Sequence, residues 1–119
     1  IVSCFALGNP TLPVYRGEIQ CRGFGLDVQV FDDDGKPVVG EKGELVCTAP
    51  FPSMPVGFWN DADGSRFRAA YFERFAGAWN HGDYALETAH GGFVILDNSA
   101  TGATLRLLFP IARQKGAAK

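Results

Sequence analysis

The sequence predicts a mainly β fold in which antiparallel hairpins accompany one short helix. Its 119 residues are enough for one domain or for one piece of a larger domain. The 15 glycines and 7 prolines make up nearly a fifth of the chain, and this density of chain breakers favours short strands joined by turns over long helices. Apolar residues contribute 46%, which suffices for a packed core and excludes wholesale disorder.

A first hairpin is predicted between residues 17 and 48. Residues 17–31 alternate apolar and polar side chains, as a half-buried strand does. The apolar face consists of Leu26, Val28 and Val30. Turns are expected at 32–36, which contains Asp-Gly, and at 41–43, and residues 44–48 resume an antiparallel strand. The acidic triplet Asp32–Asp34 lacks the ligand spacing of a calcium loop and is predicted as a solvated turn.

An irregular segment with three prolines follows at residues 49–55. A proline-rich ligand for a partner domain is one interpretation of it. The neighbouring apolar side chains favour the other interpretation, a crossing segment whose large residues are buried. These residues are Phe51, Met54, Phe58 and Trp59.

One short helix is predicted near residues 65–76. Ser65 is a suitable N-cap, and Gly77 is placed to end the helix. Aromatic residues recur at every fourth position and form a stripe that we expect to pack on the core. The stripe consists of Phe67, Tyr71 and Phe75. A second hairpin then joins strands at 84–87 and 93–96 through a turn at His90–Gly92.

Charge divides the chain into two parts. The formal net charge is −2, which argues against a nucleic-acid partner. Residues 1–97 hold 7 basic and 13 acidic residues, whereas residues 98–119 hold 4 basic residues and no acidic ones. We therefore expect a folded unit at 1–97 and a divergent basic tail at 98–119. Arg66, Arg68 and Arg74 are expected on the solvent face of the helix rather than against bases.

Neither a membrane span nor a targeting segment is predicted. No apolar run reaches the length of a spanning helix, and Ile1–Leu7 lacks the basic region of a signal peptide, so the chain is expected to enter in mid-domain. Cys4, Cys21 and Cys47 have neither disulfide nor zinc spacing. They are predicted to be buried thiols of a cytoplasmic protein.

Groups that could carry catalysis are scarce. The chain has two histidines, His81 and His90, and no recognised nucleophile motif or phosphate loop. His90 is expected to be satisfied by its neighbours in a turn. The residues alone therefore predict no catalytic group and no metal site.

Several ordered motifs nevertheless resemble those of one enzyme superfamily. Gly43–Val46 and Val56–Trp59 are followed by Tyr71–Phe72, by Trp79–Tyr84 with its Gly-Asp pair, and by Gly91–Ile95. In this order they resemble the adenylate-forming enzymes.

The resemblance narrows to the acetoacetyl-CoA synthetase family. It is carried by Ile1–Phe5, Asn9–Pro10, Pro13–Gln20 and Ala49–Pro55, and it covers about residues 1–95. It implies a barrel-like β subdomain of an acid–thiol ligase that uses ATP, magnesium and coenzyme A. It also implies that Asp83 accepts hydrogen bonds from a ribose diol, as an acceptor-only carboxylate can. Gly82, without a side chain, would let the nucleotide approach.

The departures from the family bear on function. Its phosphate loop and ATP-binding motif are expected upstream of Ile1, and residues 96–99 replace its Gly-Arg-x-Asp hinge. Lys115 and Lys119 do not match its catalytic lysine, and an altered reading frame or a recombined end would explain the tail.

Three interpretations follow from these departures. The first is a ligase fragment, not catalytic alone, that binds no cofactor tightly and self-associates through exposed apolar surface. The second is a stand-alone β domain that binds a protein partner or, weakly, a nucleotide. The third, an enzyme of other chemistry, is disfavoured by the residue census.

Overall fold

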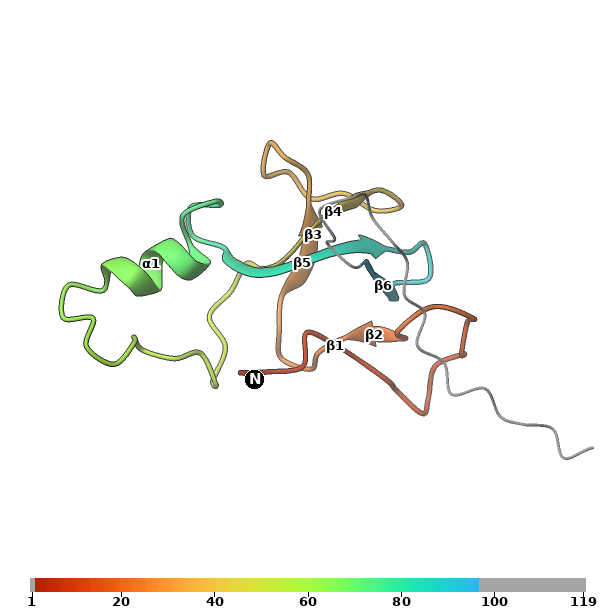
Figure 1. The fold of residues 1–119 in the computed structure, drawn as a ribbon. Helices are drawn as coiled ribbons and strands as arrows, with labels where there is room; N and C mark the ends of the chain where they lie inside the picture. The colour runs from red at the N-terminus through yellow and green to blue at the C-terminus, as the bar shows by residue number, and fades with distance from the viewer. Residues whose placement is uncertain (1, 97–119) are drawn as a thin grey trace, which may run out of the picture.

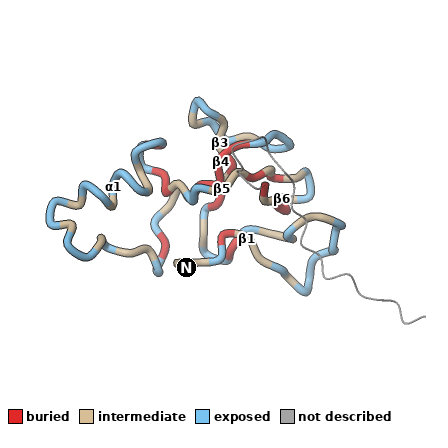
Figure 2. The backbone as a smooth tube through the Cα atoms, viewed as in Figure 1, coloured by how far each residue is buried: buried red, intermediate tan, exposed pale blue. Residues whose placement is uncertain are grey.

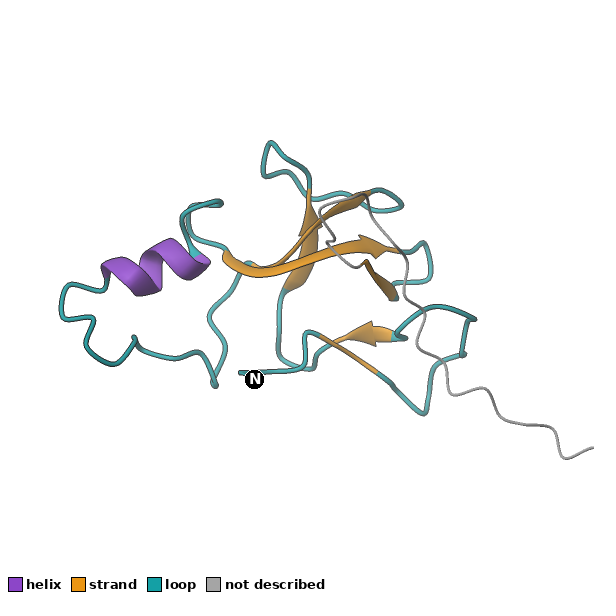
Figure 3. Cartoon of the chain, in the orientation of Figure 1, coloured by secondary structure: helices purple, strands orange, loops and turns teal. Residues whose placement is uncertain are grey.

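The computed structural model describes residues 2–96, which form two antiparallel sheets and one helix (Figures 1 and 3). The elements in chain order are β1 (Ala6–Leu7), β2 (Cys21–Arg22), β3 (Val28–Phe31), β4 (Lys42–Cys47), α1 (Ser65–Tyr71), β5 (Trp79–Glu87) and β6 (Phe93–Leu96). β1 and β2 form a separate two-stranded sheet, and the four-stranded sheet has the order β3-β4-β5-β6. The larger sheet curls into a half-barrel, which confirms the predicted fold class. The predicted tail at 98–119 lies outside the described residues.

The first hairpin is confirmed, although its opening strand is shorter than predicted. β3 pairs with β4 from Val28 opposite Cys47 to Phe31 opposite Glu44, and Val28 and Val30 are fully buried on one face. The strand does not extend back to residue 17 because a turn intervenes at Gly23–Leu26, where Leu26 N–H donates to the Gly23 carbonyl. Within this region, β2 and an isolated bridge from Ile19 to Phe93 are paired.

The two predicted turns differ in outcome. The Asp32 carboxylate accepts the N–H groups of Asp34 and Lys36 at 3.0 and 2.8 Å, so the first is a solvated turn as predicted. The second prediction is wrong, because Lys42 and Gly43 already belong to β4. A Cβ on Gly43 would lie 2.1 Å from the Phe31 carbonyl oxygen, so the close approach of β3 requires glycine there.

The helix exists and begins at residue 65 as predicted, but the predicted N-cap and the predicted C-terminal end are wrong. α1 begins at Ser65 without a serine cap, and the Asp61 carboxylate instead accepts the N–H groups of Arg66 and Phe67 at 3.1 and 2.9 Å. It ends at Tyr71, well before Gly77. Phe75 therefore leaves the predicted stripe and packs edge-on against Phe31, with ring centroids 5.4 Å apart.

Trp79 belongs to the main core cluster, and Figure 2 shows buried backbone gathered where β3, β4 and β5 lie together. Tyr71 stacks on the Trp79 indole at 3.7 Å, and Phe51 meets it edge-on at 5.6 Å. Burial of the crossing segment is confirmed for Phe51 but wrong for Trp59, which is 90% exposed. No helix within residues 2–96 is long and apolar enough to cross a membrane.

Candidate functional site: a carboxylate on a strand bulge

The second hairpin contains an irregularity at the predicted nucleotide-binding residues. Tyr84 of β5 lies opposite Glu44, whereas Asn80 lies opposite Val46, so residues 81–83 face a single residue of β4. Gly82 has a φ of +90°, which favours glycine. A bulge of this kind bends the strand and re-aims its side chains.

The strand predicted at 84–87 would leave Asp83 just before the strand begins. β5 runs from Trp79 to Glu87, which places Asp83 in mid-strand on the bulge. Its side chain is 50% exposed, and its Oδ2 lies 3.1 Å from Nδ1 of His81. The bulge thus presents the Asp83 carboxylate to solvent although the residue lies within a strand.

A hollow of about 200 Å³ opens beside this carboxylate. The N-terminal segment forms one wall, the bulge another, and apolar side chains from three strands or their flanks close the rest. The lining residues are Ser3, Cys4, Phe5, Ala6, Ile19, Leu45, His81, Asp83 and Ile95. The Phe5 ring packs on the His81 imidazole with centroids 4.6 Å apart. This volume is below the roughly 300–1,000 Å³ of whole small-molecule sites, so it suits one ring of a ligand.

His81 is the neighbour that sequence reasoning missed. It borders the hollow at Asp83 and also a second hollow of about 320 Å³ beside Tyr71 and Trp79. The signal was the His-x-Asp spacing, since residues two apart share one face of a strand.

His90 and Glu44 lie away from this hollow, and each has a partner. The His90 ring stacks on Tyr15 at 3.8 Å, and its Nδ1 lies 3.1 Å from Glu18 Oε1, which confirms that neighbours satisfy it. Glu44 is buried on β4, and burial raises the pKa of its carboxyl, while Arg74 at 2.5 Å opposes this rise. No group of acidic, histidine or cysteine side chains within residues 2–96 is suited to holding a metal ion.

The thiols only partly match the prediction. Cys47 is buried and Cys21 half-buried, but Cys4 is exposed beside the hollow, so the expectation of three buried thiols is wrong. On this segment the buried position is taken by the next residue, Phe5, which packs in the core.

Comparisons with known proteins agree on one family. No protein-family model matches the chain. The chain is 68% identical over 95 residues to the acetoacetyl-coenzyme A synthetase of Rhizobium meliloti (strain 1021), which covers 80% of this chain and 15% of that protein. Identity to the acetoacetyl-CoA synthetase of Gallus gallus is 54% over 100 residues, covering 83% of this chain and 15% of that protein.

A solved structure gives the same answer. The acetoacetyl-CoA synthetase from Streptomyces lividans superposes with a TM-score of 0.74 at 52% identity, over 77% of this chain and 14% of that chain. The mainly β segment thus matches one part of that much larger structure. Over these residues the chain belongs to the acetoacetyl-CoA synthetase family, and it spans about 15% of the length of the curated relatives it matches.

Proposed function

We propose that the chain is the part of an acetoacetate–CoA ligase that presents a ribose-binding carboxylate. In the complete ligase, ATP would activate acetoacetate as an acyl-adenylate, and coenzyme A would then form the thioester. The observation that supports this role is the half-exposed Asp83 carboxylate at the edge of a ring-sized hollow. We further propose that the chain alone is not catalytic and that it resides in the cytoplasm, where free thiols persist.

The described residues fit one part of the nucleotide. An ionised carboxylate accepts two hydrogen bonds from a vicinal diol. Gly82 leaves the approach open, because no atom lies within 4 Å of the position that a Cβ would occupy there. His81 would hold Asp83 in place through the 3.1 Å contact. Residues 2–96 supply no cluster for magnesium, so the metal and the phosphates would need groups outside them.

The expected affinity of the chain alone is low. Two hydrogen bonds to a charged acceptor contribute roughly 1.5–3 kcal/mol each at best. Association costs at least about 4 kcal/mol, so at most about 2 kcal/mol remains, which corresponds to a Kd of roughly 30 mM or weaker. AMP titration followed by NMR should accordingly move only the resonances of residues 81–84, and weakly.

Matched variants make this test specific. Asp83→Ala should abolish the shifts, whereas Asp34→Ala, which removes an exposed carboxylate from a distant turn, should leave them unchanged. Micromolar binding, or shifts centred on the basic residues 106–119, would show that the nucleotide binds elsewhere.

A second candidate function is favoured by one observation. Trp59 is 90% exposed and Val56 completely so, which suits a protein-interaction module. The DNA that flanks the coding segment discriminates between the two. Ligase motifs in frame upstream favour the ligase, and their absence favours the stand-alone module.

A further inference from the structure

We propose that the Arg22–Glu87 ion pair docks the β1–β2 ribbon on the half-barrel and thereby positions one wall of the hollow beside Asp83. What the hollow binds rests on the proposed function, but the docking does not. Arg22 and Glu87 are thus assigned as positioning residues, since neither lines the hollow.

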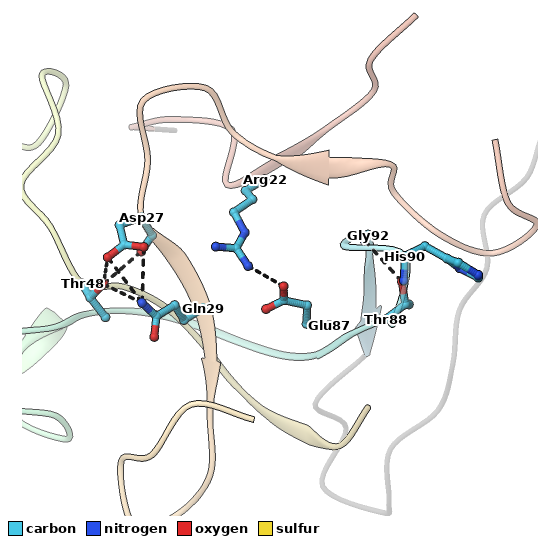
Figure 4. Close-up of polar contacts among 8 residues, drawn as sticks. All are labelled: Arg22, Asp27, Gln29, Thr48, Glu87, Thr88, His90 and Gly92. Carbon is cyan, nitrogen blue, oxygen red and sulfur yellow. Dashed lines mark hydrogen bonds and ion pairs between the residues drawn. The ribbon is translucent and has the colours of Figure 1, made fainter. Parts of the chain in front are cut away.

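The pair joins two separate sheets. Arg22 belongs to β2, and Glu87 ends β5 (Figure 4). The Glu87 side chain is 9% exposed, and the Arg22 guanidinium donates to its Oε1. A buried carboxylate without a counter-ion is costly, so the ribbon is favoured in the one place where Arg22 reaches Glu87.

The ribbon transmits this position to the hollow. Arg22 lies opposite Ala6 and Cys21 opposite Leu7 in the β1–β2 pairing. Beyond the pair, Gly23 N–H donates to the Phe5 carbonyl at 2.8 Å. Phe5 and Ala6 belong to the hollow's N-terminal wall, so β2 fixes the distance between that wall and the bulge.

A second set of contacts fastens the segment that leads into β2. Ile19 and Phe93 exchange two backbone hydrogen bonds of 2.8 Å, and Glu18 accepts from the Thr88 hydroxyl at 2.8 Å. Gly92 allows this approach, since a Cβ there would lie 2.8 Å from the Ile19 carbonyl oxygen. The Ile19–Phe93 bridge is the backbone link between ribbon and half-barrel that hydrogen exchange can monitor.

The test uses the full chain and the exchange rates of its amides. Arg22→Gln should speed exchange of the Ile19 and Phe93 N–H groups about tenfold, as expected for the loss of a partly exposed ion pair to a buried carboxylate. The amides of β4, in the centre of the half-barrel, should keep their rates. Arg66→Gln removes the same charge from the exposed face of α1 and should change neither set.

Further variants separate docking from folding. Glu87→Gln should reproduce the effect, and Arg22→Lys, which keeps the charge, should restore most of the protection. Equal acceleration in β4 would mean global destabilisation, and unchanged exchange at Ile19 and Phe93 would mean that the pair does not dock the ribbon. Either outcome overturns the proposal.

The link to the hollow has its own readout. Arg22→Gln should also lose the AMP-induced shifts at residues 81–84 although Asp83 is intact and β4 remains protected. Retained shifts would overturn the positioning role. If the unaltered chain shows no AMP shifts at all, the proposed function fails while the exchange result still decides the docking.

Discussion

Replacing Arg74 by alanine should destabilise the chain at neutral pH and much less in acid. Glu44 is only 4% exposed on β4, and the guanidinium of Arg74 reaches its Oε1 at 2.5 Å and Asp33 Oδ1 at 2.9 Å. Burial holds the pKa of Glu44 above its ordinary value, Arg74 lowers it, and the charges of Asp33 and Asp83 raise it further. Removing Arg74 therefore leaves the ionised Glu44 carboxylate without the positive charge that offsets its burial and its repulsion by Asp33 and Asp83.

The magnitude follows from burial. Breaking a fully buried ion pair costs about 3–5 kcal/mol. The Arg74 side chain is 44% exposed, so solvent screening reduces the estimate to about 2 kcal/mol at pH 7. Because the folded-state pKa of Glu44 is raised, its contribution to stability is fully present below the unfolded pKa and is lost as pH rises through the folded pKa. A protonated Glu44 needs no counter-ion, so the cost of Arg74→Ala should largely vanish in acid.

Urea unfolding monitored by Trp79 fluorescence measures this difference. With a slope of about 1 kcal/mol per molar urea, the variant midpoint should fall by about 2 M at pH 7 and by less than about 0.5 M near pH 4. Arg66→Ala is the charge-matched control and should show no such pH dependence. Adding Glu44→Gln to Arg74→Ala should also remove it. An equal loss of stability at both pH values would refute the reasoning.

Two further predictions concern the chain as a whole. It should catalyse no acetoacetate-dependent pyrophosphate exchange, because the described residues hold no metal-binding group to meet the phosphate charge of the transition state. Exchange above a blank that Asp83→Ala removes would contradict this. It should also self-associate through the surface at Val56 and Trp59, so light scattering should show dimers or larger species that Trp59→Ser reduces. Trp79 is buried, so its fluorescence serves as the internal reference for an intact fold in the Trp59→Ser variant. A monomer at high concentration would count against association.

The sequence predicted the strands better than the helix. Alternating burial at Val28 and Val30 and the Asp-Gly turn at 32–36 are local signals, and the structure keeps them. The residue at which α1 ends is not determined by the local sequence. Phe75 fits a helical stripe, but after Tyr71 the chain leaves the helix, and Phe75 packs on Phe31 instead. Contacts between distant residues overrode the periodicity.

The candidate site likewise combines features that the local sequence predicts with features that depend on contacts between distant residues. The Gly-Asp motif identified Gly82 and Asp83 without reference to any distant residue. The bulge depends on the pairing of β5 with β4, where residues 81–83 face Leu45, and no single-strand pattern specifies that register. The N-terminal wall was also unpredictable, because Phe5 meets His81 only through tertiary packing.

The hollow's size and construction together account for the weak nucleotide binding that we expect of this chain. One wall is carried by the β1–β2 ribbon, which is joined to the half-barrel by the Arg22–Glu87 ion pair, by polar contacts and by the packing of the adjoining Phe5 in the core. The other wall is a bulge anchored in the sheet. About 200 Å³ between them accommodates a sugar ring but no base or phosphates, and each missing contact leaves the entropic cost of association unopposed. A ligand that spanned the hollow and reached groups beyond it would gain those contacts and would hold the ribbon against the sheet. Binding and ribbon docking should therefore stabilise each other, by the reciprocity that links any two equilibria in one molecule.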